Sequence, residues 1–102
     1  MTPRLLLRPE AHADLEEAFE WYEERSIGLG HEYLRLVRVA LAAIERVPDA
    51  FPAVLDDIRR VGVRRFPYYI YYVARASETA VIAVLHGRRD PASLAIAPLR
   101  SN

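Results

Sequence analysis

Two arginine pairs in the last third of the chain have the residue type and spacing to bind anions. Arg64 and Arg65 come before a run of aromatic and β-branched residues, and Arg88 and Arg89 follow a second such run. Arginine stays charged at any ordinary pH, and its planar guanidinium donates paired hydrogen bonds to phosphates and carboxylates. We therefore expect these four arginines to contact an anionic target or partner.

Three residues of the same region are candidates for catalysis. His86 lies at the end of a predicted strand beside the second arginine pair, where an imidazole could act as a general base. Tyr69 and Arg89 are the other candidates. The competing interpretation, which we favour, is that His86 is a strand-end histidine bonded to a neighbouring backbone group.

The tyrosines of the first run could stack nucleobases, as aromatic residues on sheet surfaces do in RNA-binding domains. Alternation along a strand puts Tyr69 and Tyr71 on one face, with Ile70 and Tyr72 on the other. At least one of these pairs should therefore pack beneath the helices. Sheet tyrosines more often belong to a core than to a base-stacking surface.

Composition argues against several other kinds of site. The 102 residues include no cysteine and three scattered histidines, so we expect neither a disulfide nor a metal site. All 14 basic residues are arginine, which leaves no lysine for a Schiff base. We expect no cofactor. No stretch is apolar enough to span a bilayer and the start is too short for a signal peptide, so we expect one cytoplasmic domain over residues 1–102.

The net charge of zero hides an uneven distribution along the chain. Residues 10–32 contain eight acids and one base, whereas eight arginines and two acids follow from Arg59 onward. We therefore expect negative charge on the helices and positive charge on the sheet.

Hydrophobic periodicity predicts the elements that position these residues. A short strand at about residues 3–8, with three leucines, could be buried on both faces. A helix should begin at Pro9 and end around residues 26–30, where two glycines permit a sharp turn. Trp21 lies on the flank of its apolar stripe and is a candidate for an exposed partner contact.

A second helix is predicted from near His31 to Pro48, which ends it. Its inner face should carry Tyr33, Leu36, Val37, Ala40, Leu41, Ile44 and Val47. A loop over residues 49–57 should lead to a strand containing Val61 and Val63. Pro67 then opens a turn into the tyrosine strand, and residues 75–78 turn into the last strand. The predicted fold class is α+β: an N-terminal strand, a helical hairpin and a three-stranded antiparallel meander, β-α-α-β-β-β.

This order resembles the RelE/ParE family of bacterial toxins. The resemblance covers nearly the whole chain and is closest in two segments, residues 64–72 (RRFPYYIYY) and residues 85–91 (LHGRRDP). It implies the toxin of a type II toxin–antitoxin system, sometimes labelled a plasmid stabilisation protein. A cognate antitoxin would neutralise it, and DNA would be bound only through the complex with that antitoxin.

The resemblance leaves the molecular target open between two branches. ParE-like members poison DNA gyrase, whereas RelE-like members cleave mRNA on the ribosome with lysines, arginines and a C-terminal tyrosine. This chain lacks the lysines and that tyrosine, and Tyr69 stands where the RelE branch has an arginine. We therefore expect a ParE-like gyrase inhibitor that acts by binding, with Trp21 and the hairpin as a possible target surface. A ribosome-dependent ribonuclease, a non-toxic structural partner of the antitoxin and a homodimer remain alternatives.

Overall fold

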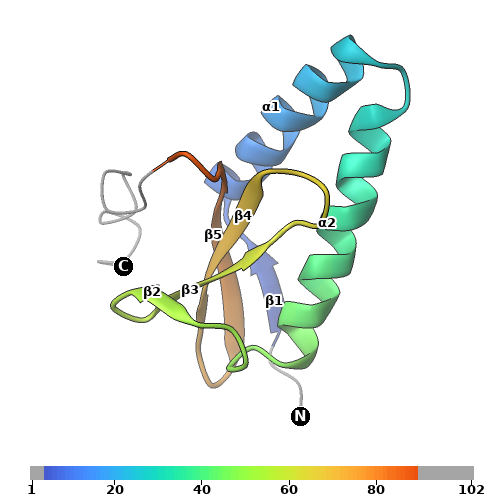
Figure 1. The fold of residues 1–102 in the computed structure, drawn as a ribbon. Coiled ribbons are helices and arrows are strands. Elements are labelled where there is room, and N and C mark those ends of the chain that lie inside the picture. Colours follow the sequence, from blue (N-terminus) through green and yellow to red (C-terminus); the bar gives the residue numbers. More distant parts are fainter. Residues whose placement is uncertain (1–3, 90–102) are drawn as a thin grey trace.

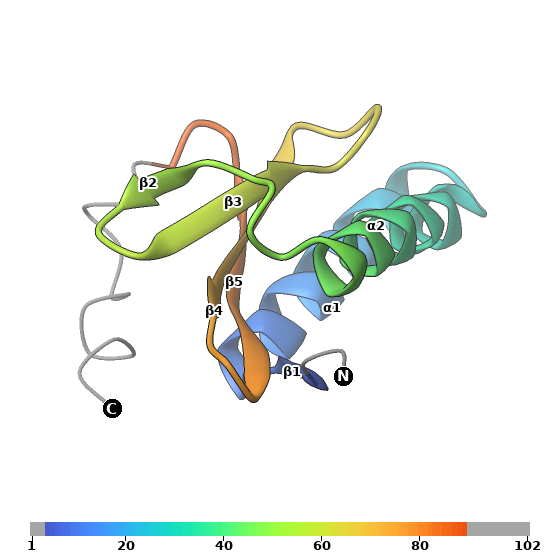
Figure 2. The same cartoon turned by 90° about the horizontal axis from the view of Figure 1, so that it is seen from below.

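The computed structural model describes residues 4–89, which form two helices and a five-stranded sheet (Figure 1). In chain order the elements are β1 (Arg4–Leu7), α1 (Pro9–Arg25), α2 (Leu29–Arg46), β2 (Ala53–Leu55), β3 (Ile58–Gly62), β4 (Tyr68–Ala74) and β5 (Glu78–His86). The predicted α+β class and the helical hairpin are confirmed. Both helices lie on the same side of the sheet (Figure 2).

The strand order across the sheet is β1-β5-β4-β3-β2. The strands β2 to β5 form an antiparallel meander, whereas β1 pairs in parallel with β5, with Leu7 opposite Val81. Because β1 covers only the first four residues of β5, no strand within residues 4–89 lies beside the second half of β5 on that side. Because β1 is shorter than β5, this part of the sheet edge is open to α1.

The prediction of a loop over residues 49–57 was wrong, because residues 53–55 form the edge strand β2. The meander therefore has four strands instead of three. A two-residue turn joins β2 to β3, and Asp56 in it has a left-handed φ of 50°. Aspartate tolerates this conformation better than most residues. A strand of three residues is too short to show a hydrophobic period, which is why the sequence did not reveal it.

The strand predicted around Val61 and Val63 ends one residue earlier than expected, at Gly62. Val63 instead starts the turn to β4, where its amide donates to the Tyr68 carbonyl at 2.9 Å. The predicted alternation along β4 is confirmed. Ile70 and Tyr72 pack in the cluster beneath the helices, and Tyr71 packs on the opposite face of the sheet.

The seam between α1 and α2 is closed by backbone contact. A Cβ atom at Gly30 would lie 2.7 Å from the carbonyl oxygen of Phe19, so only glycine fits there. One carboxylate also completes the turn, because the Glu23 oxygens accept the amides of Gly28 and Gly30 at 2.8 and 2.9 Å. These amides begin α2 and have no partners within that helix.

The inner face of α2 is buried as predicted, except at Leu41, which is half-buried, and at its end. Val47 is 43% exposed, because it caps the helix instead of continuing the apolar stripe. The leucines of β1 are only half-buried, since β1 is an edge strand, and the expectation of burial on both faces was wrong.

Candidate functional site

The described residues enclose a groove of about 500 Å³ between α1 and the adjoining end of β4 and β5. One wall comes from α1, and the other comes from the start of β4, the end of β5 and the segment after it. The lining residues are Asp14, Glu17, Ala18, Trp21, Tyr22, Pro67, Tyr68, Val84, Leu85, His86 and Arg89. A concave apolar site with a few converging polar groups is the usual form of a binding site.

The groove exists because α1 crosses β5 where β1 has ended. The last contact of the β1 end is the Arg8 amide, which donates to the Val81 carbonyl at 2.9 Å. Three residues further along β5, the Val84 amide donates to the Asp14 carboxylate at 2.9 Å. A side chain of α1 therefore satisfies a strand amide that would otherwise lack a partner, and it anchors the helix to the sheet.

Three aromatic side chains, Trp21, Tyr22 and Tyr68, are among the residues that line the groove. Trp21 is 48% exposed, as predicted, and packs edge-on against Tyr22 at 5.1 Å between centroids. The Trp21 ring makes a cation–π contact with Arg25, whose guanidinium lies 3.5 Å from the ring centroid. Tyr22 in turn contacts Tyr68 across the groove at 6.1 Å.

Tyr33 lies directly behind this surface. Its ring is completely buried and lies 5.4 Å from Tyr22 and 5.3 Å from Tyr68. Its hydroxyl has no hydrogen-bond partner among the described residues, which is uncommon for a buried polar group. Burial, followed by the nearby tyrosines and Asp14, raises the pKa of Tyr33, so the hydroxyl stays protonated.

His86 lies in the groove wall, and its surroundings are those of a structural residue. Its Nδ1 accepts the Arg88 amide at 3.1 Å, which leaves the proton of the neutral ring on Nε2. The ring also packs edge-on against Tyr68 at 5.4 Å. The hydrogen bond to a neighbouring backbone group that the strand-end interpretation expects is therefore present.

Tyr69, another catalytic candidate, lies on the opposite face of the sheet from the groove. The guanidinium of Arg60 covers its ring at 4.1 Å from the centroid. Ideal Cβ positions at Gly62 and Gly87 lie 3.5 and 3.3 Å from the same ring, so both glycines pack against it. The ring is thus used in packing, and Arg60 is a cation that the sequence reasoning did not single out.

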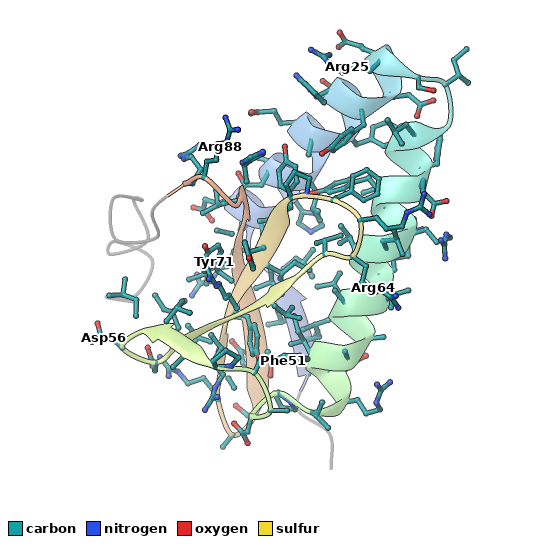
Figure 3. All side chains as sticks on the ribbon, viewed as in Figure 1. Arg25, Phe51, Asp56, Arg64, Tyr71 and Arg88 are labelled. Carbon is teal, nitrogen blue, oxygen red and sulfur yellow. The ribbon has the colours of Figure 1, made fainter. Side chains whose placement is uncertain are left out.

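The four predicted arginines come from two loops at one end of the sheet. The loops adjoin each other, because the Gly87 amide donates to the Pro67 carbonyl at 2.7 Å. Figure 3 nevertheless shows Arg64 and Arg88 well apart, with β4 between them in this view. None of the four forms an ion pair within residues 4–89. The structure therefore presents two separate pairs of available guanidinium groups.

The surroundings of the two pairs also differ. The pKa of Glu32 is lowered by its hydrogen bond with Arg35 and, more weakly, by the charge of Arg65, which places Arg65 near the start of α2. Arg89 instead lines the groove. The expected negative charge on both helices was wrong for α2, which carries two acids and three arginines. The acids are concentrated on α1, seven against one arginine.

The groove thus brings together Trp21, His86 and Arg89, and leaves out Arg64, Arg65, Arg88 and Tyr69. The sequence reasoning missed the acidic wall of Asp14 and Glu17, because a glutamate-rich helix usually has a solvated face. Among residues 4–89 no three histidine, cysteine or acidic side chains cluster as metal ligands. Neither described helix combines the length and the apolar character that crossing a membrane requires.

Comparison with known families decides which kind of protein this is. The profile described as "ParE toxin of type II toxin-antitoxin system, parDE" matches residues 5–91, which include both helices, β2 to β5 and all of β1 except Arg4. The chain belongs to the ParE toxin family. The recognition made from the RRFPYYIYY and LHGRRDP segments is confirmed, and so is the ParE-like branch.

A solved structure shares the fold of this ParE-family protein. It is a chain of the chromosomal ParDE TA system from P. aeruginosa, with a TM-score of 0.72 and 16% sequence identity. The match covers 83% of this chain and 96% of the other. No curated protein gives a match.

Proposed function

We propose that this ParE-family toxin inhibits growth by binding a macromolecular target, DNA gyrase, and that a cognate antitoxin neutralises it by laying a segment in the groove. The groove is the observation that carries this proposal. It is already formed in the isolated chain, it is lined by exposed Trp21, and it lies against the loop that carries Arg88 and Arg89. A segment bound there would also cover part of the arginine surface.

The contacts of the catalytic candidates favour action by binding over catalysis. A general base needs a free nitrogen or oxygen within hydrogen-bond reach of the substrate proton that it removes. In His86 the Nδ1 atom already accepts a backbone amide, and the Tyr69 ring is covered by Arg60. No lysine is present to replace them. Gyrase is the target suggested by membership in the ParE branch, and the arginines would contact phosphates or carboxylates of the gyrase–DNA complex.

Controlled expression in bacteria tests the function and the target together. We expect arrested growth, filamentous cells, an induced SOS response and DNA breaks trapped on gyrase. Co-expression of the protein encoded by the neighbouring gene should restore growth. mRNA cut inside ribosomes without an SOS response would overturn the proposal in favour of a ribonuclease. Normal growth would overturn it in favour of a non-toxic structural partner.

Substitution of the arginines tests their role. Arg88→Ala and Arg89→Ala should together raise the toxin level needed for growth arrest at least tenfold, because each removes a guanidinium that forms no ion pair within residues 4–89. Arg38→Ala is the matched control, since Arg38 is exposed on α2 and also lacks a described ion pair. Equal toxicity of the double variant and the control would exclude this anion contact.

A further inference from the structure

The α1 wall of the groove carries two carboxylates that can accept further hydrogen bonds. Asp14 uses its Oδ2 atom to accept the Val84 amide, and its Oδ1 atom has no partner within residues 4–89. Glu17, one helical turn further on, forms no ion pair or hydrogen bond there. Arg89 is the one cation among the described residues that line the groove, and it is solvent-exposed at the rim.

Burial and a neighbouring negative charge disfavour the ionised form of Asp14. Burial is the main reason that the pKa of Asp14 is raised, and the charge of Glu17 adds to it. The Val84 amide and Arg89 act in the opposite direction without cancelling the rise. Burial, and then Glu17, also raises the pKa of Tyr68 on the opposite wall. The charge of Glu17 therefore acts on a group of each wall, Asp14 and Tyr68, and an incoming cation would offset it.

The aromatic surfaces suit the same kind of ligand. Tyr22 and Tyr68 form the apolar part of the groove near the two carboxylates, and ring faces attract cations. Trp21 shows that this happens within the chain, because its ring holds the Arg25 guanidinium.

We propose that the groove receives an arginine or lysine side chain of the antitoxin segment, with the Glu17 carboxylate and the free oxygen of Asp14 as its counter-charges. The aliphatic part of this side chain packs against Tyr22 and Tyr68. The inference rests on the proposed function, because it concerns the antitoxin that occupies the groove. It commits to a basic anchor, whereas Arg64, Arg65 and Arg88, which do not line the groove, attract acidic residues of the same partner.

The test uses the purified toxin and the purified protein encoded by its neighbouring gene, with affinity measured by calorimetry. Glu17→Arg should weaken binding at least tenfold, because it places a positive charge where the anchor binds. Asp14→Asn, which keeps an oxygen for the Val84 amide, should weaken binding several-fold. Glu16→Arg is the matched control, since Glu16 is an exposed neighbour on α1 that does not line the groove, and it should change the affinity less than twofold.

A second arm identifies the anchor in the antitoxin. Each arginine and lysine of its toxin-binding segment is replaced in turn by glutamate, and one of these changes should lose binding to the natural toxin and regain it with Glu17→Arg. Equal affinities of Glu17→Arg and Glu16→Arg, or the lack of any compensating pair, would overturn the inference and leave the proposed function standing. If the neighbouring protein does not bind the natural toxin at all, the proposed function itself fails.

Discussion

The α1 helix borders two seams that are packed very differently. Against α2 the backbones approach so closely that a methyl group at Gly30 would overlap the Phe19 carbonyl. Against the sheet the same helix leaves a groove of about 500 Å³, bridged by the Asp14–Val84 hydrogen bond. The closed seam fixes the angle of the hairpin, so the open seam can keep its shape without being filled. We therefore expect the closed seam to contribute more to stability, and we propose the open seam as the binding side of the helix.

The largest expected effect is at the closed seam. Gly30→Ala should lower the free energy of unfolding by about 2–3 kcal/mol, because its Cβ would lie 2.7 Å from a backbone oxygen that cannot move without shifting α1. Urea unfolding measures this. Gly62→Ala is the control, since its Cβ would meet nothing closer than the Tyr69 ring at 3.5 Å. Equal stability of the two variants would show that the seam is looser than the structure indicates.

The bridge across the open seam should matter less. Asp14→Ala leaves the Val84 amide without its acceptor, which should cost about 1–3 kcal/mol of unfolding free energy. Hydrogen exchange of the Val84 amide should quicken by at least tenfold in the same variant. Asp14→Asn should restore most of the protection, because its amide oxygen can accept the same bond. If exchange at Val84 does not change, the bridge contributes nothing to holding α1 on the sheet.

Removing the exposed ring of the open seam should have a still smaller effect on stability. Trp21→Ala should cost under about 1 kcal/mol, since the side chain is 48% exposed, but it should weaken antitoxin binding more than tenfold. Val39→Ala is the control, because Val39 is 52% exposed on α2, outside the groove, and should leave affinity unchanged. Equal affinities of the two variants would separate the groove from antitoxin binding.

The smallest expected effects concern pH. One carboxylate at each seam should change the free energy of unfolding with pH, and the two changes should have opposite signs. The Gly28 and Gly30 amides lower the pKa of Glu23, so its contribution is present above pH 4.5 and is lost as the pH falls further. Burial raises the pKa of Asp14, so its contribution is present below pH 3.8 and is lost as the pH rises through the folded pKa. Unfolding of the natural protein should be compared with Glu23→Gln and Asp14→Asn between pH 3 and 7.

In that comparison, the advantage of the natural protein over Glu23→Gln should shrink on acidification. Its advantage over Asp14→Asn should grow. Slopes of the same sign would contradict the different surroundings that the structure gives these two carboxylates.

Local patterns made much of the fold predictable. The apolar stripe from Tyr33 to Ile44 and the alternation of Ile70 and Tyr72 are periodic, so they revealed both the elements and their buried faces. The strand β2 is too short to have a period, and Val47 continues the helical spacing although it lies at the cap.

Single residues of the groove were predictable from the sequence, but their positions relative to one another were not. Trp21 was recognised as an exposed ring, and His86 and Arg89 were recognised by their chemistry, but nothing in the sequence joined them. Asp14 is 70 residues away from the Val84 amide that it accepts. A glutamate-rich helix gives no sign of which of its acids will face a groove.

The sequence by itself determined the amphipathic helices, the tyrosine strand, the unusual reliance on arginine and the family, because these depend on residue type and short-range spacing. Only the tertiary structure decided that β1 pairs in parallel with the first half of β5 and that α1 crosses the second half of β5. The reason is that β1 and α1 are far from β5 along the chain, so this placement depends on long-range packing. That packing sets Asp14 and Glu17 opposite Tyr68, and it creates the site.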